Sequence, residues 1–275
     1  MNEVIGFSPE NFIVTKEYKR FTEFCDACKR YQYIGLCYGK PGVGKTLSAR
    51  YYTRWDRIET LAEIRYECVL TPQSDILDCD SVFCTIPATP TQLQLEREVK
   101  VSRNKLNFLV DDMRVLCSST QQELPAKPEN VVKLLLVDEV DRLKASGLEY
   151  LRDVYDRSHI GLILIGMPGI EKRLSRYPQL YSRVGFVHHF RTLAPEEMRF
   201  IIEHKWQQFG LQFDPNDFTD TEALDLTIQI TNGNFRLVRR LFEQIERILL
   251  INELRHVTKD VVEAARARLV IGATT

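Results

Sequence analysis

The stretch Gly39-Lys40-Pro41-Gly42-Val43-Gly44-Lys45-Thr46 fits the pattern G-x-x-x-x-G-K-[ST] without a substitution. A short apolar and aromatic run at 33–38 precedes it, and residues 46–52 have the composition of an opening helix. A strand, a glycine-rich loop and a helix in this order are the setting in which the pattern binds phosphate. The sequence therefore predicts a phosphate loop that binds a nucleotide.

Each residue type in this loop has a chemical reason to be there. Glycines let backbone N–H groups turn inward and approach the phosphates without a Cβ in the way, and the helix N-terminus adds partial positive charge. We expect Lys45 to reach the β- and γ-phosphates and the Thr46 hydroxyl to be a ligand of Mg²⁺.

A second informative stretch, at 131–139, is a nearly all-apolar run that ends in Asp138 and Glu139. Such a run is typical of a central strand of a parallel sheet, and these sheets bind ligands at the carboxyl ends of their strands. We expect Asp138 to hold Mg²⁺ through water, and Glu139 to orient and deprotonate the attacking water. The predicted nucleotide-binding residues are Gly39, Pro41, Gly42, Val43, Gly44, Lys45, Thr46, Leu47 and Asp138, with Thr46 and Asp138 on the metal.

Beyond these two stretches, the chain changes character near residue 193. Before that point, apolar runs at 81–86 and 161–166 predict core strands, with helical patterns between them, so strands and helices alternate as in a doubly wound α/β sheet. After it, the patterns are helical without a convincing strand, and Thr258 is a candidate N-cap for the last helix. The predicted domains are an N-terminal arm and helix (1–30), an α/β nucleotide-binding core (31–193) and a small all-helical lid (194–275).

Bulk composition narrows the class of protein and the cellular compartment that we expect. The 275 residues are 44% hydrophobic and 27% charged, as in an ordinary soluble globular protein, and the formal net charge of −1 gives no overall attraction to nucleic acid. Seven cysteines, an odd number, and no signal peptide favour a reduced cytoplasmic protein. No apolar run approaches the length of a membrane helix. Cys25 and Cys28 form a lone C-x-x-C, which favours two partly buried helix residues over a zinc site.

The phosphate loop, the apolar strand ending in Asp-Glu, the further core strand and the helical C-terminal part resemble the AAA+ ATPases, over about residues 31–270. The resemblance implies a P-loop NTPase core with a parallel sheet flanked by helices, a helical lid, and hydrolysis of ATP with Mg²⁺. One departure concerns the strand ending 164–168, which lacks the Asn, Thr or Ser that serves this family as first sensor. This departure suits a slow, switch-like ATPase.

Two arginines fit the resemblance. The stretch 181–186 is similar to the Ser-Arg element that initiators and clamp loaders present to a neighbouring subunit, which makes Arg183 a candidate arginine finger acting on the γ-phosphate in trans. Arg236, which opens a helix after an Asn-Gly-Asn turn, is similar to the second sensor of the lid. The rival residues are Arg173 and Arg176 for the finger, and Arg239 and Arg240 for the sensor. With Glu139, Arg183 and Arg236 complete the predicted catalytic set.

Within that family, the runs 164–174, 177–183 and 137–143 are similar to the transposon-encoded ATPases of the TniB, TnsC and MuB type; ATPases of the ExeA type share several of these features. The resemblance implies a homo-oligomer, a ring or a helical filament, that assembles on double-stranded DNA with ATP and recruits or activates a transposase. It implies no membrane partner.

The residues themselves support DNA binding only through a basic stretch of the 91–117 helix, where point charges could meet phosphates without base readout. Its basic residues are Arg97, Lys100, Arg103 and Lys105, the last three being the candidate DNA contacts. A solvated helix face is the competing interpretation. Two other functions stay open: an ATPase switch acting on protein partners in secretion or signalling, and a replication initiator or helicase loader. An initiator would usually carry a winged-helix module after the lid, and we expect no room for one before Thr275.

Overall fold

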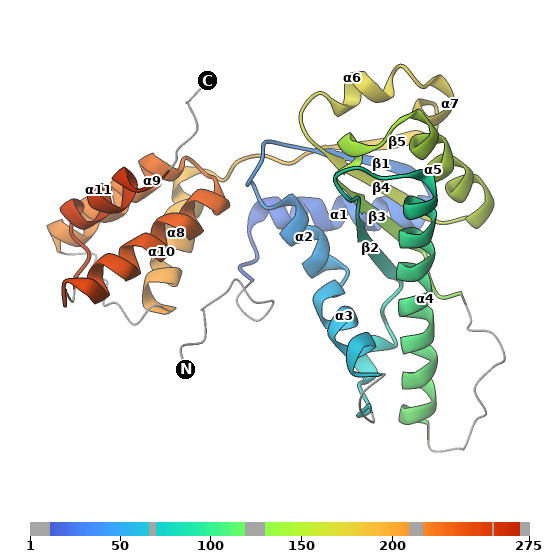
Figure 1. Cartoon of the computed structure of the whole chain (residues 1–275), viewed down its shortest axis with the longest axis horizontal. Coiled ribbons are helices and arrows are strands. Elements are labelled where there is room, and N and C mark those ends of the chain that lie inside the picture. Colours follow the sequence, from blue (N-terminus) through green and yellow to red (C-terminus); the bar gives the residue numbers. More distant parts are fainter. Residues whose placement is uncertain (1–11, 66–69, 119–129, 209–216, 255, 270–275) are drawn as a thin grey trace. The chain divides into compact units, whose positions relative to one another are not determined.

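The computed structural model describes residues 12–65, 70–118, 130–208, 217–254 and 256–269 (Figure 1). Two compact units divide the chain: an α/β unit of 1–39 and 45–190, and a helical unit of 40–44 and 191–275. The α/β unit contains a five-stranded parallel sheet in the order β2-β3-β4-β1-β5. Its strands are β1 (Ile34–Tyr38), β2 (Ser81–Thr85), β3 (Leu134–Asp138), β4 (Gly161–Gly166) and β5 (Val184–His189).

Helices account for most of the remaining described residues. The α/β unit contains α1 (Lys16–Tyr31), α2 (Lys45–Tyr52), α3 (Trp55–Ile64), η2 (Ser74–Ile76), α4 (Gln92–Cys117), η3 (Val140–Arg142), α5 (Ala145–Ser158), α6 (Ile170–Leu174) and α7 (Pro178–Tyr181). The helical unit contains α8 (Pro195–Gln208), α9 (Phe218–Thr231), α10 (Phe235–Ile251) and α11 (Lys259–Ala267). The predicted fold class, a parallel sheet flanked by helices followed by a helical C-terminal part, is confirmed.

Burial explains why some strands were easy to predict and one was missed. Every residue of β3 and β4 is buried, which accounts for their continuous apolar sequences. Strand β5 lies at the sheet edge, alternates half-buried and exposed residues, and ends in two histidines, so its sequence does not read as a core strand. The predicted strand at 131–139 is shorter than expected, because regular pairing begins only at Leu134.

Local capping sets the ends of several helices. Thr91 and Gln94 form a reciprocal capping box at the start of α4, and Thr15 accepts a hydrogen bond from the Tyr18 amide at the start of α1. Thr258 caps α11, as predicted. The helix that opens at the phosphate loop ends at Tyr52 and a second one begins at Trp55, since Arg54 between them takes a left-handed conformation (φ 53°). No helix in the described part of the chain could cross a membrane.

Gly35, the second residue of β1, tests how closely α1 packs on the sheet. A Cβ added at Gly35 would lie 2.5 Å from Cys28 Sγ and 2.6 Å from Phe24 Cζ, and both of these side chains are buried. Gly35→Ala should therefore lower the free energy of unfolding by about 1–3 kcal/mol, the usual cost of overpacking. Chemical denaturation measures this, with the exposed Ser146→Ala as control. A loss for Gly35→Ala no larger than the control's would contradict the packing.

Candidate nucleotide-binding site

The glycines of the phosphate loop have backbone conformations that other residues avoid. Gly42 and Gly44 have φ values of 81° and 106°, a region in which an L side chain is strained. At Gly39 the constraint is space, because an added Cβ would lie 2.3 Å from the carbonyl oxygen of Phe190. Glycine is therefore required at three positions of the loop, in line with a backbone shaped to approach a ligand closely.

Lys45 is the first residue of α2, and its side chain turns back to the loop. Its Nζ donates a hydrogen bond to the Gly39 carbonyl at 2.6 Å, and the residue is buried. Burial lowers the pKa of Lys45, while the nearby carboxylates of Asp138, Glu139 and Asp141 oppose that shift. A cation removed from water in this way gains from an anionic ligand, so Lys45 is placed to bind phosphate.

Thr46 and Asp138 are brought together from positions far apart in the sequence. Thr46 Oγ1 donates to Asp138 Oδ2 at 2.5 Å, and the Glu139 amide donates to Asp138 Oδ1 at 2.8 Å. Asp138 is buried, and burial raises its pKa, although both hydrogen bonds act in the opposite direction. The sequence-predicted metal pair is thus one hydroxyl and one carboxylate in direct contact.

This donor set fits Mg²⁺. Magnesium prefers hard oxygen ligands and is commonly held by one or two protein groups together with substrate phosphates and water. In the described part of the chain no cluster of three or more His, Cys, Asp or Glu residues could hold a metal ion. A site that depends on Thr46, Asp138 and a bound triphosphate agrees with both observations.

Glu139 leaves the end of β3 in a left-handed conformation, with φ 60° and ψ 37°. Its side chain is half-buried, and Oε2 lies 3.7 Å from Arg142 Nη2. A non-glycine residue in this region stores strain, and such residues cluster at functional sites. The turn directs the chain away from the sheet immediately after Asp138, so the two carboxylates do not continue the alternation of a strand.

Asp141 is a residue of this site that sequence reasoning missed. Its Oδ2 accepts a hydrogen bond from the Met167 amide at 2.7 Å, at the carboxyl end of β4. A Cβ on Gly166 would lie 2.7 Å from the same oxygen, so Asp141 fills the space that a side chain of β4 would take. Burial raises the pKa of Asp141. The end of β4 therefore lacks Asn, Thr or Ser but is contacted by a carboxyl group from η3. The sequence signal that could have singled out Asp141 was the spacing Asp-Glu-x-Asp.

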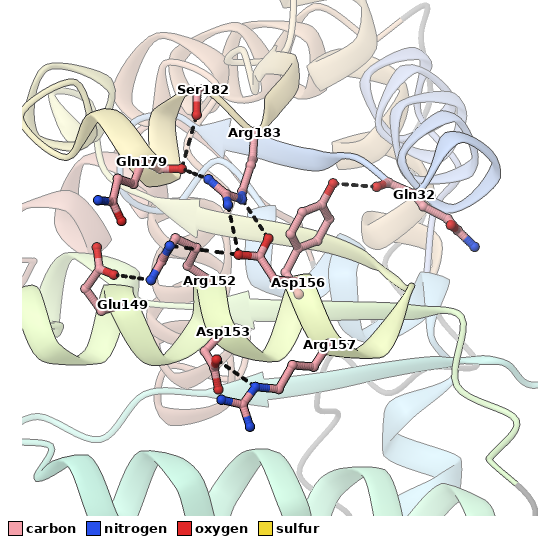
Figure 2. Close-up of polar contacts among 10 residues, drawn as sticks. Gln32, Glu149, Arg152, Asp153, Asp156, Arg157, Gln179, Ser182 and Arg183 are labelled. Carbon is pink, nitrogen blue, oxygen red and sulfur yellow. Dashed lines mark hydrogen bonds and ion pairs between the residues drawn. The ribbon is translucent and has the colours of Figure 1, made fainter.

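The candidate arginine finger and its rivals have different surroundings. Arg173 donates from Nη1 to the carbonyl of Asp141 at 2.6 Å and from Nη2 to that of Leu143, so it is used inside the subunit. Arg176 is exposed. Arg183 precedes β5 and forms an ion pair with Asp156 of α5 (Figure 2).

In the helical unit, Arg236 lies exposed in the first turn of α10, and its amide donates to the side chain of Asn234, which caps the helix. Of its rivals, Arg239 forms an ion pair with Glu243 at 2.8 Å, and Arg240 is exposed. The role of Arg236 as second sensor stays a prediction.

The candidate DNA contacts on α4 are not equally available. Lys100 is exposed, as is Arg97 one turn earlier. Arg103 and Lys105 are half-buried, and Arg103 Nη1 donates to Ser158 Oγ of α5 at 3.3 Å. The four basic residues therefore do not form one solvent-facing row.

Cys25 and Cys28 are both buried on α1 and free of disulfides. Burial raises the pKa of the Cys28 thiol to about 12. In the described ranges neither residue belongs to a cluster that could hold a metal ion. Their burial on α1 shows that both are packed helix residues.

Known proteins are similar to this chain over the range that contains the candidate site. The sequence profile of a family described as "AAA domain" matches residues 28–174, more than half of the chain. A "Potential ATP-binding protein" of Staphylococcus aureus is 47% identical over 272 residues, which cover 96% of this chain and 98% of that protein. The chain belongs to the AAA domain family. The matched range contains the phosphate loop, Asp138, Glu139 and Asp141.

This AAA domain protein also has more distant similarities, to a phage protein and to two solved structures. The "ATP-dependent target DNA activator B" of Escherichia phage Mu is 25% identical over 182 residues, 64% of this chain but only 50% of the phage protein. Among solved structures, the RuvB Holliday junction branch migration motor of Thermotoga maritima has a TM-score of 0.57 at 16% identity, over 95% of this chain and 72% of that one. The Aeropyrum pernix ORC2 protein gives 0.59 at 16%, over 94% and 68%. These two structures support the fold alone.

Proposed function

We propose that this AAA domain protein is an ATPase that assembles on double-stranded DNA when it holds ATP, and that recruits or activates a transposase during target selection. Hydrolysis of ATP to ADP and phosphate is slow and releases the assembly. The homo-oligomer is a ring or a helical filament, with ATP bound between subunits.

The contact between Thr46 and Asp138 at 2.5 Å carries the ATPase part of the proposal. Bound Mg²⁺ would neutralise charge on the β- and γ-phosphates at this pair. Lys45 binds the same phosphates as a buried cation, and Glu139 accepts a proton from the attacking water. Arg183 of a second subunit adds positive charge at the γ-phosphate in trans, so that nucleotide links subunits as well as being hydrolysed. Arg236 contacts the nucleotide from the lid.

Similarity to the phage Mu activator carries the DNA part, because that protein is described as an ATP-dependent target DNA activator. The exposed charges of Arg97 and Lys100 on α4 give this chain cations with which to meet a phosphate backbone. Arg103 is half-buried and hydrogen-bonded to Ser158, so the basic surface of α4 is smaller than its sequence suggests. This observation favours the competing proposal, a nucleotide-dependent switch acting on protein partners.

DNA binding should require the triphosphate. Binding to labelled duplex is measured with ATP, a non-hydrolysable analogue and ADP, each at two salt concentrations, with electron micrographs of every mixture. We expect salt-sensitive binding with ATP and the analogue, regular oligomers on the DNA, and release with ADP.

A variant pair then tests the surface on α4. Arg97→Glu combined with Lys100→Glu should weaken DNA binding at all duplex sequences and reduce the slope of log K against log salt by about 1 per lost phosphate contact. Lys19→Glu, an exposed charge reversal on α1, is the control. Nucleotide binding without any DNA binding would instead support the protein-directed switch.

A further inference from the structure

Arg183 is held by a carboxylate of its own subunit. Its Nε donates to Asp156 Oδ1 at 2.6 Å and its Nη2 to Asp156 Oδ2 at 2.9 Å, a side-on bidentate pair (Figure 2). Nη1 donates to the carbonyl of Gln179 in α7. Two elements, α5 and α7, therefore fix the plane of the guanidinium group.

Asp156 is itself restrained from the other side. Arg152, one turn earlier on α5, places Nη1 3.9 Å from Asp156 Oδ2 and Nη2 2.9 Å from Glu149 Oε2. Figure 2 shows these side chains in a row along α5, with Arg183 approaching from the segment before β5. The side chain of Asp156 thus lies between two guanidinium groups, which limits its rotamers.

The contacts of Arg183 leave part of its hydrogen-bonding capacity open. A guanidinium group has five N–H donors, and the three hydrogen bonds above use three of them, so two remain. The side chain of Arg183 is 31% exposed, so it is partly open to an anion from outside the subunit. The bidentate geometry of the Arg183–Asp156 pair orients the guanidinium group. Because the pair is exposed, its attraction is weak, and a phosphate can compete for Arg183.

We propose that Asp156 is a positioning residue that orients Arg183 toward the phosphate oxygens of a nucleotide bound by a second copy of this chain. This inference rests on the proposed function, in which Arg183 acts in trans. Asp156 acts through Arg183, whose geometry at the γ-phosphate determines the rate.

The same helix offers a matched control. Asp153 is three residues earlier, carries the same charge and forms an ion pair with Arg157 at 2.8 Å, without contacting Arg183 (Figure 2). Changing either residue to asparagine removes one negative charge from α5. Only the change at position 156 removes the carboxylate that contacts Arg183, whose Nη1 keeps its hydrogen bond to Gln179.

The test compares Asp156→Asn, Asp156→Glu, Asp153→Asn, Arg183→Ala and the double variant Asp156→Asn/Arg183→Ala. Turnover at saturating ATP, affinity for ATP, and oligomer size with a non-hydrolysable analogue are measured for each. We expect Asp156→Asn to lose roughly 10- to 100-fold in turnover with unchanged ATP affinity. Asp156→Glu should retain more turnover than Asp156→Asn, Asp153→Asn should match the wild type, and the double variant should equal Arg183→Ala.

Several results would overturn the inference. Turnover of Asp156→Asn above the wild type would mean that the ion pair restrains Arg183 instead of orienting it. If Asp156→Asn and Asp153→Asn had equal turnover while Arg183→Ala was inactive, Asp156 would have no role in positioning Arg183. The proposed function would then stay intact. Full turnover and assembly of Arg183→Ala would contradict the role of Arg183 itself, and with it the inference.

Discussion

Glu139→Gln should bind ATP as tightly as the wild type and lose turnover by about 100-fold or more, the usual contribution of a positioned general base. Glutamine keeps the shape of the side chain but cannot accept the proton of the attacking water. Lys45, Thr46 and Asp138, the residues that we propose bind the phosphates and Mg²⁺, are unaltered. Because hydrolysis is the step that releases the proposed assembly, this variant should accumulate ATP-bound oligomers that persist after free ATP is removed.

Equilibrium binding of labelled ATP, steady-state phosphate release and light scattering measure the three parts of this result. Glu63→Gln, the same substitution at an exposed position of α3, is the control for the loss of one negative charge. Turnover near the wild-type rate would exclude Glu139 as the base and direct attention to Asp141, a further carboxyl group near the ends of the central strands.

The parts of the fold that sequence alone predicted are those with a strong local cause. Strand β4 runs from Gly161 to Gly166, the predicted limits, because it is buried throughout and begins and ends with glycine. The phosphate loop is equally local, since its pattern encodes the positive φ values of Gly42 and Gly44. Position 54 gave no such signal: the left-handed Arg54 that separates α2 from α3 is neither glycine nor asparagine.

What the sequence could not show depends on contacts between distant residues. The ion pair of Arg183 joins residues 27 positions apart, and nothing near either residue marks the other. Asp141 contacts the end of β4 across 26 positions, so its spacing after Asp138 and Glu139 could single it out in the sequence, but its contact with that strand could not be predicted. The left-handed conformation of Glu139 is likewise a property of the turn after β3, which a run of apolar residues ending in two acids does not specify.

Arg183→Ala should bind ATP and hydrolyse it at least 100-fold more slowly than the wild type, since a finger supplied in trans is worth about 10³–10⁵ in rate where it has been measured. Lys45→Ala should fail to bind ATP, because the buried ammonium on the phosphate loop is lost. Each variant alone is therefore inactive for a different reason, one lacking the donated arginine and the other the nucleotide.

Mixing the two variants tests whether Arg183 acts between subunits. A Lys45→Ala subunit still presents Arg183, so it can complete the site of an adjacent Arg183→Ala subunit that holds ATP, and turnover should return to about a quarter of the wild-type level if the subunits mix randomly around a head-to-tail assembly. Capture of untagged Arg183→Ala by tagged Lys45→Ala confirms that mixed assemblies form. Mixed assemblies without recovered turnover would place Arg183 in its own subunit's chemistry, because a residue that acts in trans must rescue a neighbour whose nucleotide site is intact.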